Sequence, residues 1–317
     1  MFNNSFIAHN NNFFQKKIVI IIFYILFIII FNIIYFRKLR TINNIKVCLC
    51  TIGKNENNYV KEFIEHYKNY GIDKIVIYDN NDIDGERFEE LLNNYIKNNF
   101  VEILDYRGKE KIQLNSINDC YKNNFLNYNW LLFYDMDEFI NLKERNIKFF
   151  LAKKKFNSCE RIYLNWVNHL DNDQLNYKNQ SLFKRFPKFK YFFNKTKALV
   201  KSMIRGNIPN IRIYNNHVIN FEKESCNAFG VKKLFNQSNT IENPDNKNYY
   251  IDHFYFKSAE EYINKRNRGS VFYGNKSRIS LYFIDLYFKY NRITKEKINY
   301  FEKKTIFNLS KYKNFLN

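Results

Sequence analysis

The chain has 317 residues, enough for one large domain or two small ones. Hydrophobic residues make up 45% and aromatic residues 19%, which is ample for a packed core and excludes an intrinsically disordered chain. The formal net charge is +20, but the lysines are scattered along the whole sequence. Since no helix-turn-helix, zinc-finger or RNA-binding signature accompanies this charge, we expect a solvated basic surface and no nucleic-acid partner.

The first predicted element is a membrane anchor. Residues 18–36 are almost entirely apolar, and Asn32 is their only strongly polar member. A helix of about 20 apolar residues spans a bilayer core of roughly 30 Å. A cleavable signal peptide would have a shorter apolar core, about 7–15 residues, followed by a small-residue cleavage site that is missing here. The sequence therefore predicts an N-terminal tail over 1–17, a transmembrane signal anchor over 18–36 and a short stem over 37–45.

Strands and helices alternate after the stem. Strands separated by helices form βαβ units, so we expect an α/β fold with a mostly parallel central sheet. Ligands bind at the carboxyl ends of the strands in such sheets, and three of the four ends here are rich in carboxylates. Short apolar runs predict the strands, and apolar residues at helical spacing predict the helices: strands over 46–52, 74–78, 100–104 and 130–134, and helices over 59–70, 86–98 and 111–124.

The second half of the chain is less regular. We expect strands over 160–166, 198–204 and 211–214, and a helix over 258–267 with Ser258 as its N-cap. No Gly- or Pro-rich linker and no internal repeat divides the chain after the stem. We therefore expect one domain over 46–290, followed by a basic and aromatic tail over 291–317.

The five cysteines include no CxxC pair, which argues against a zinc ribbon or a thioredoxin-like site. Cys48 and Cys50 are two residues apart on a predicted strand, so they share a face and are expected in the core. An odd number of cysteines does not indicate a disulfide scaffold, although it allows one bridge.

The strongest chemical signal is the pair Asp135 and Asp137, directly after the apolar run 130–134. In an extended strand both side chains share a face and can reach one site. Magnesium and manganese prefer carboxylate oxygens and also take substrate phosphates as ligands. An isolated acidic pair is common in loops, but its place at a strand end in an α/β pattern favours a metal site. His253 is a further candidate ligand, although a lone histidine near an apolar run is more often structural.

Polar residues after the first two strands could contact a nucleotide. Asn55 and Glu56 follow the first strand, and Asp79 and Asn80 follow the second. An ordinary Asx turn is the competing interpretation of 79–82. The sequence contains no GxxxxGK[ST], GxGxxG, GxSxG or HExxH pattern. P-loop kinases, Rossmann dehydrogenases, α/β-hydrolases and zincin proteases are thereby excluded.

An ordered set of motifs over roughly 46–274 resembles glycosyltransferase family 92 and the related family 2-like enzymes. Each motif is unspecific alone, but their order is specific. They are Cys50-Thr51-Ile52-Gly53-Lys54-Asn55-Glu56, Tyr78-Asp79-Asn80-Asn81-Asp82, Asp105-Tyr106-Arg107-Gly108 with Gln113 and Asn118-Asp119-Cys120-Tyr121, Asp135-Met136-Asp137-Glu138-Phe139, Trp166, Lys184-Arg185-Phe186, Lys201-Ser202-Met203-Ile204, and His253-Phe254-Tyr255-Phe256-Lys257-Ser258 with Glu261, Lys265, Arg268 and Gly269.

The resemblance implies a GT-A type fold, a nucleotide-binding α/β sandwich whose DxD motif holds manganese or magnesium. It implies transfer of a hexose, with galactose as a family precedent, from a nucleotide sugar to a glycan or another hydroxyl acceptor. Asp135, Asp137 and His253 would hold the metal. Asn55, Glu56, Asp79, Asn80, Arg107 and Lys257 would bind the nucleotide sugar.

Direct displacement with inversion is the expected mechanism, in which a carboxylate deprotonates the acceptor hydroxyl. Spacing does not assign this base, and Asp171, Asp173, Glu222 and Glu224 are all candidates. Two rival functions stay open. One is a nucleotidyltransferase or sugar-phosphate transferase on a similar sheet, and the other is a non-catalytic, membrane-anchored binding protein.

The resemblance also implies a type II Golgi protein with residues from 46 onward in the lumen. Lys16 and Lys17 precede the predicted anchor and three basic residues follow it, which mildly favours a cytoplasmic domain instead. Five possible glycosylation sequons after the stem give weak support to the lumenal orientation, because an Asn-rich chain produces them by chance. They begin at Asn179, Asn194, Asn236, Asn275 and Asn308.

Overall fold

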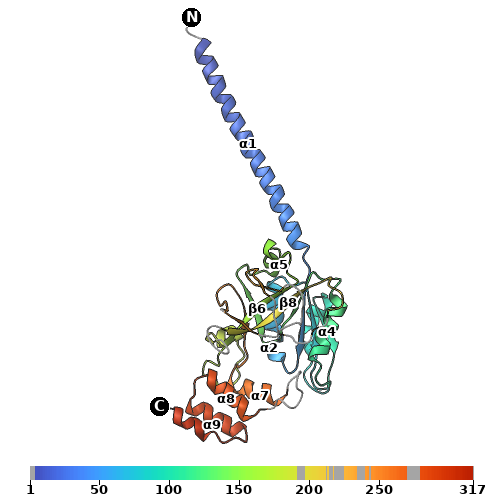
Figure 1. Cartoon of the computed structure of the whole chain (residues 1–317), viewed down its shortest axis with the longest axis vertical. Helices are drawn as coiled ribbons and strands as arrows, with labels where there is room; N and C mark the ends of the chain where they lie inside the picture. Colours follow the sequence, from blue (N-terminus) through green and yellow to red (C-terminus); the bar gives the residue numbers. More distant parts are fainter. Residues whose placement is uncertain are drawn as a thin grey trace. The chain divides into compact units, whose positions relative to one another are not determined.

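The computed structural model describes residues 4–190, 197–211, 213, 217, 225–233, 240–242, 244–269 and 279–316. The chain forms two units, Met1–Ile45 and Lys46–Asn317. The first contains a single helix, α1, over Asn4–Asn43 (Figure 1).

The predicted transmembrane segment over 18–36 lies inside α1. From Phe23 to Phe36, where its side chains are described, the apolar side chains of this helix are exposed. Among the described residues no helix is both long enough and apolar enough to cross a membrane, so the predicted anchor is not supported there.

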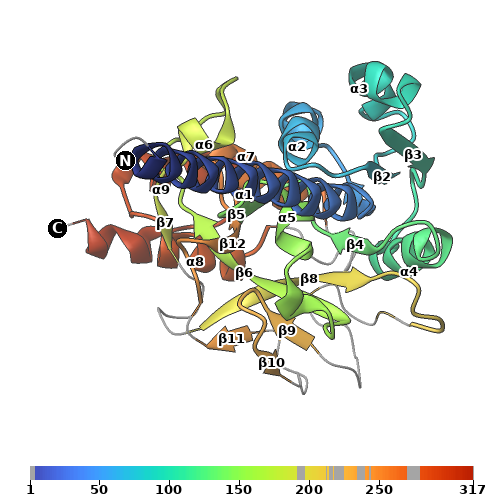
Figure 2. The same cartoon turned by 90° about the horizontal axis from the view of Figure 1, so that it is seen from above.

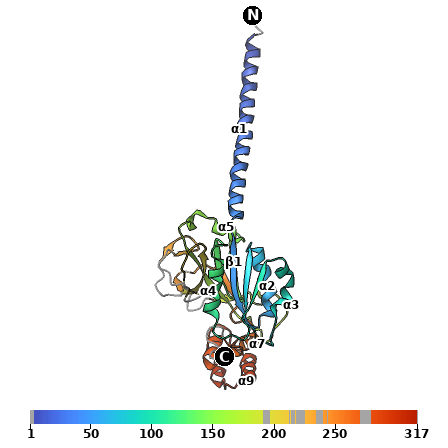
Figure 3. The ribbon, with the colours of Figure 1, turned by 90° about the vertical axis from the view of Figure 1, so that its right-hand side faces the viewer.

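The second unit is an α/β fold, as expected, and the seven predicted elements of its first half are confirmed within two residues. The strands are β1 (Val47–Gly53), β2 (Lys74–Asp79), β3 (Val101–Asp105) and β4 (Trp130–Phe133). The helices are α2 (Asn57–Asn69), α3 (Phe88–Lys97) and α4 (Gln113–Asn124). Figure 3 shows β1 between α4 on one side and α2 and α3 on the other.

The second half supplies most of the remaining strands: β5 (Glu138–Leu142), β6 (Arg161–His169), β7 (Phe189–Lys190), β8 (Lys197–Arg205), β9 (Ser225–Asn227), β10 (Lys232–Lys233), β11 (Thr240–Glu242) and β12 (Tyr249–His253). The predicted strands over 160–166 and 198–204 correspond to β6 and β8. The strand predicted over 211–214 is not formed at Ile211 or Ile213, and residues 212 and 214 lie outside the described residues. Short helical segments α5 (Ile147–Leu151), η1 (Lys154–Phe156) and α6 (Leu182–Arg185) connect these strands.

The sheet is mixed, so the prediction of a mostly parallel sheet is wrong. Its main path runs β10-β9-β6-β8-β4-β1-β2-β3. The strands β4, β1, β2 and β3 are parallel because helices connect them in the chain. By contrast, β8 is antiparallel to both β4 and β6, and β12 is antiparallel to β5. Figure 2 shows β9, β10 and β11 gathered beside β6 and β8.

Three helices close the C-terminal end of the unit: α7 (Ala259–Asn267), α8 (Leu281–Tyr290) and α9 (Lys295–Lys304), followed by the short η3 (Ser310–Phe315) (Figure 1). The predicted helix over 258–267 is α7, and Ser258 is its N-cap. The Ser258 hydroxyl accepts a hydrogen bond from the Glu261 backbone N–H (3.3 Å), and a Glu261 carboxylate oxygen accepts one from the Ser258 N–H (3.1 Å), forming a capping box.

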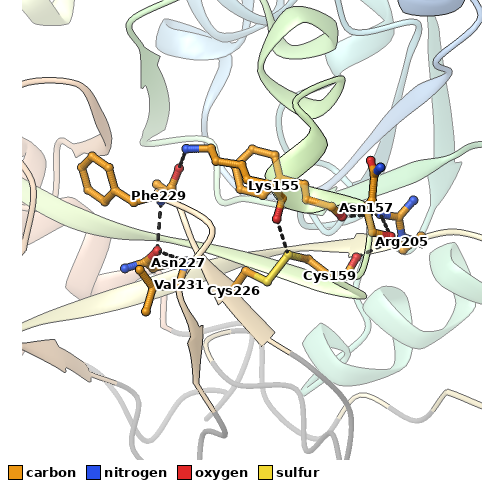
Figure 4. The surroundings of a disulfide bond; sticks show 10 residues. Lys155, Asn157, Cys159, Arg205, Cys226, Asn227, Phe229 and Val231 are labelled. Atoms are coloured by element: carbon orange, nitrogen blue, oxygen red, sulfur yellow. Dashed lines mark hydrogen bonds between the residues drawn. A yellow bond between two sulfur atoms is a disulfide. The ribbon is translucent and has the colours of Figure 1, made fainter.

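Two disulfides connect distant parts of this unit. Cys50–Cys120 joins β1 to α4 inside the hydrophobic core. Cys159–Cys226 joins the segment before β6 to β9, and the Arg205 guanidinium donates a hydrogen bond to the Cys159 carbonyl oxygen (2.9 Å; Figure 4). The expectation drawn from the odd cysteine count is therefore wrong, because four cysteines are paired and Cys48 alone is a free, buried thiol. Cys48 and Cys50 lie in the core, as predicted.

Candidate functional site

Asp135 and Asp137 lie in a turn rather than in an extended strand. The turn connects β4 to β5, and the Glu138 backbone N–H closes it by donating to the Asp135 carbonyl oxygen (3.0 Å). The two carboxylates therefore do not share a strand face, and each has its own set of partners.

Asp137 is buried and contacts two groups from the C-terminal half of the chain. Because β12 pairs antiparallel with β5, His253 lies opposite Glu138, and its Nε2 is 3.7 Å from Asp137 Oδ1. The Lys265 ammonium, from α7, contacts the other oxygen of Asp137. Burial alone would raise the pKa of Asp137, but Lys265 and His253 hold it well below the usual value. Burial lowers the pKa of His253, so its imidazole is neutral at pH 7.

Asp135 has a different counter-ion. Lys201, fully buried on β8, lies 2.8 Å from Asp135 Oδ2 and 3.2 Å from Glu138 Oε1. Burial alone would raise the pKa of Asp135, but the Lys201 ammonium lowers it below the usual value. For Glu138, burial outweighs Lys201 and raises the pKa well above the usual value. Asp135 and Lys201 thus form an ion pair, and beside it lies Glu138, whose ionisation burial opposes.

These groups open onto a cavity of about 200 Å³, here called the DxD cavity. Its lining includes four cationic and three acidic side chains: Lys54, Lys265, Arg266 and Arg268, with Glu56, Asp135 and Asp137. Trp166 also lines it, and its ring lies 4.1 Å from that of His253, centroid to centroid. Among the described residues, Trp166 Nε1 and His253 Nδ1 are buried and have no hydrogen-bond partner. The cavity wall thus carries more cationic than acidic side chains, which suits an anionic, polar ligand.

The predicted nucleotide-binding residues Asn55, Glu56 and Lys257 lie next to this cavity. Buried Glu56 bridges Lys257 Nζ (3.4 Å) and Arg268 Nη2 (2.6 Å). Burial alone would raise the pKa of Glu56, but these two cations lower it. Asn55 and Lys257 both have left-handed backbones, with φ of 53° and 54°. This conformation is unfavourable for lysine, and strained residues of this kind concentrate at functional sites.

The other predicted nucleotide-binding residues form a separate network. Arg107 Nη2 lies 2.7 Å from Asp79 Oδ2 and also contacts Glu89. The Asn80 side-chain amide donates to the carbonyl oxygens of Tyr106 (3.0 Å) and Lys109 (2.7 Å). Asp79, Asn80 and Arg107 thus join the loops that follow β2 and β3, and none of them lines the DxD cavity.

Comparison with known proteins identifies the family. The model described as Glycosyltransferase family 92 matches residues 43–271, which is more than half of the chain. The chain belongs to glycosyltransferase family 92.

Solved structures with some similarity include S. aureus TarS. TarS 1–349 in complex with UDP-GlcNAc is 13% identical, with a TM-score of 0.32 over 51% of this chain and 45% of that one. S. aureus TarS is 10% identical, with a TM-score of 0.35 over 82% of this chain and 48% of that one. This family 92 chain thus spans about half the length of these two structures. No curated protein matches it.

The residues of this family 92 chain fit a divalent cation in part. Asp137 and His253 place a carboxylate oxygen and an imidazole nitrogen 3.7 Å apart, and both ligand types suit manganese. Asp135 does not join them: among the described residues, only Cys48, Cys50 and Cys120 bring three ligand atoms within 4.8 Å of one another, and two of these form a disulfide. A metal at the DxD turn would therefore have Asp137 and His253 as its protein ligands.

Two candidate bases, buried Asp171 and exposed Asp173, are engaged with Lys297 away from the DxD cavity. Asp171 Oδ2 accepts from the Tyr287 hydroxyl (2.6 Å) and lies 2.5 Å from Lys297 Nζ. Asp173 also contacts Lys297 (2.8 Å), and neither carboxylate lines the cavity. Glu222 and Glu224 lie outside the described residues.

Several cations of the site received no role from the sequence, among them Lys201, Lys265 and Arg268. Lys201 interrupts the otherwise apolar run 198–204, and a lysine on a buried strand signals a buried counter-ion. Lys265 and Arg268 are three residues apart at the end of α7, so they share one helix face. Arg268 Nη1 also donates to the carbonyl oxygen of Asn55 (3.1 Å), which ties the end of α7 to the loop after β1.

Proposed function

We propose that this chain transfers a hexosyl group, galactose being the family precedent, from a nucleotide sugar to a hydroxyl of a glycan or similar acceptor, within a GT-A type nucleotide-sugar-binding fold. The observation that carries the proposal is the DxD cavity, where Lys54, Lys265, Arg266 and Arg268 surround a carboxylate pair at a strand end. Membership of glycosyltransferase family 92 supports it. This concentration of positive charge suits a departing nucleoside diphosphate.

The reaction is a direct displacement with inversion. The acceptor oxygen forms a bond to the anomeric carbon while the bond from that carbon to the diphosphate oxygen breaks. Lys265 and Arg268 bind the diphosphate and stabilise the negative charge that develops on it. The acceptor proton passes to a carboxylate, which stays unassigned.

The proposal includes a manganese or magnesium ion held by Asp137 and His253. When bound, the ion would supply Lewis-acid stabilisation of the diphosphate. Lys265 now contacts Asp137, so it must release that carboxylate and can then turn to the diphosphate. Asp135 stays paired with Lys201 and fixes the turn.

A donor screen tests the activity. The purified chain is incubated with manganese and a panel of UDP- and GDP-sugars, and released products are separated. Nucleoside diphosphate from at least one donor is expected. Release of pyrophosphate would identify a nucleotidyltransferase instead. Binding of a donor without turnover would favour a non-catalytic binding protein.

Asp137→Asn tests the metal site, because it removes one negative charge with little change in shape. We expect loss of manganese-dependent binding of UDP, measured by calorimetry. Asp84→Asn, at an exposed position of the loop after β2, is the matched control and should bind as the unmodified chain does. Unchanged manganese-dependent binding in Asp137→Asn would remove Asp137 from the metal site.

We also propose that the unit from Lys46 onward resides in the lumen of the secretory pathway, with the Golgi as the expected compartment. Its two disulfides support this, since such bonds persist in oxidising compartments and are rare in the cytosol. Asn179 and Asn308 are exposed sequon residues. Expression in secretory cells should give glycans that an N-glycosidase removes and that Asn179→Gln with Asn308→Gln reduces. Full digestion of this unit by protease on sealed microsomes would contradict the lumenal location.

A further inference from the structure

A second, larger cavity of about 630 Å³ lies beside the DxD cavity. The two cavities share three wall residues, Glu56, Lys265 and Arg268. The larger one is bounded by the loop after β1, the start of α2, the end of α7 and Tyr177. Its volume falls within the range of about 300–1,000 Å³ that small-molecule sites occupy. A ligand there would lie directly against the wall of the DxD cavity.

Four exposed asparagines line this cavity, which we call the amide cavity: Asn55, Asn58, Asn264 and Asn267. Their side-chain amides make no hydrogen bond within the described part of the chain. Each amide carries both a donor and an acceptor, and so does each sugar hydroxyl. The half-buried Tyr177 ring adds an aromatic surface. Amides and an aromatic ring together are suited to a saccharide.

The charged groups of the amide cavity, in contrast, are already engaged within the protein. Glu261 accepts from Arg185 Nη1 (3.0 Å), and Glu260 accepts from the Tyr177 N–H (2.7 Å). Lys257 pairs with Glu56 and lies 3.5 Å from the centre of the Tyr59 ring.

Glu86, the remaining acid of the lining, accepts from the Asn57 N–H (2.9 Å). Lys265 and Arg268, which the two cavities share, are likewise paired, with Asp137 and Glu56. The groups of the lining that keep free hydrogen-bonding capacity are therefore its neutral amides, which suit an uncharged ligand better than an anionic one.

We propose that the amide cavity binds the acceptor, and that this acceptor is an uncharged carbohydrate. Its reacting hydroxyl would approach the donor sugar across the wall formed by Glu56, Lys265 and Arg268. The identification of this ligand as the acceptor rests on the proposed function. Carbohydrate binding by the amide cavity can be measured without a donor.

The test uses the double variant Asn264→Ala with Asn267→Ala. Both side chains are exposed on α7, so alanine removes the amides without creating a core cavity or weakening the helix. The matched control is Asn93→Ala with Asn94→Ala, two exposed positions on α3, which does not line the amide cavity. Circular dichroism confirms folding of both.

Saturation-transfer difference NMR on the full chain measures binding of methyl β-galactoside, lactose and chitobiose at millimolar concentration. We expect a signal from at least one sugar, a dissociation constant raised about tenfold or more in the α7 double variant, and no change in the α3 control. Absence of signal from all three sugars, or equal binding by both double variants, overturns the inference. Loss of the signal on saturation with UDP alone also overturns it, because the sugar would then occupy the donor site.

The donor screen separates this result from the proposed function. If donors are hydrolysed but no sugar binds, the amide cavity inference fails alone. If sugars bind through α7 but no donor is bound or hydrolysed, the transferase proposal fails and the cavity stands as a carbohydrate site.

Discussion

Buried lysines act as counter-ions to the carboxylates of the candidate site. Lys201 has no exposed side-chain surface and neutralises Asp135. Removing one partner of a buried ion pair leaves an uncompensated charge, which costs more than the pair contributes. Single substitutions at this position therefore affect folding as well as chemistry.

Lys201→Met should lower the free energy of unfolding by about 3 kcal/mol. This value is at the low end of the range for breaking a buried ion pair, because the Asp135 side chain is 35% exposed. Urea denaturation measures the change. Lys154→Met, at an exposed lysine, is the control and should change stability by less than about 0.5 kcal/mol. A loss below about 1 kcal/mol in Lys201→Met would contradict the counter-ion role.

Stability should fall with acidity below pH 6.5. Burial lowers the pKa of His66 from 6.5 to about 4. As the pH falls, His66 therefore takes up a proton in the unfolded chain before it does so in the folded chain. The contribution of neutral His66 to the free energy of unfolding is complete above pH 6.5 and is lost as the pH falls towards 4. The slope is about 1.4 kcal/mol per pH unit for one proton. His66→Gln should reduce the slope of unfolding free energy against pH by that amount, and an unchanged slope would show that His66 titrates normally.

Asp135, Asp137 and His253 lie near one another, as the sequence predicted, but not on one face of an extended strand. The pair stands in a turn, and the partners that set its charge come from β8, β12 and α7. Such partners depend on which strands pair, and β12 lies more than 100 residues after the DxD turn. Local spacing carries no information on that pairing, so Lys201 and Lys265 received no role.

The helix α7 connects its capping box to the cations of the DxD cavity. Its N-terminal end holds Glu261 in the capping box, and its C-terminal end places Lys265 and Arg268 at the DxD cavity. Anything that loosens this helix should therefore weaken donor binding as well as stability.

Ser258→Ala should cost about 1–2 kcal/mol through loss of the N-cap and raise the donor KM at least threefold. Thr294→Ala is the matched control, because Thr294 caps α9 by accepting from the Lys297 N–H (3.2 Å) and does not line the DxD cavity. The control should lose about 1 kcal/mol with an unchanged donor KM. Equal donor KM values in the two variants would show that α7 does not position the site.

The elements themselves were predictable where each strand is followed by a helix. In residues 46–134, short apolar runs alternate with segments whose apolar residues have helical spacing. The apolar runs correspond to β1–β4. After residue 134 the strands follow one another without crossover helices, and several have two or three residues, such as β7 and β10. Strands this short leave no periodic signal. The antiparallel pairing of β8 with β4 and β6, which makes the sheet mixed, depends on contacts between distant segments that local periodicity does not show.

The whole Lys46–Asn317 unit is held by two covalent links that span 70 and 67 residues of sequence. Links of this length stabilise mainly by restricting the unfolded chain. The sequence did not reveal them, since cysteine pairing depends on how β1 packs on α4 and how β9 pairs with β6.

The protein should contain one reactive thiol, Cys48, when it is denatured without reductant and treated with a thiol reagent. In the folded chain even this thiol should be inert, because burial raises the pKa of Cys48 to about 12. Cys50→Ala with Cys120→Ala should lower the unfolding free energy by about 4 kcal/mol, measured by urea denaturation. Five reactive thiols in the secreted protein would contradict both bridges.

Lys297 has a practical consequence for protein production. This α9 lysine is buried and compensates Asp171 and Asp173 at 2.5 and 2.8 Å. A chain truncated at residue 290 would lose Lys297, leaving Asp171 without its ammonium partner and exposing the aromatic face on which Phe301 packs against Tyr287. Shortened versions made for crystallisation or expression should therefore keep α9.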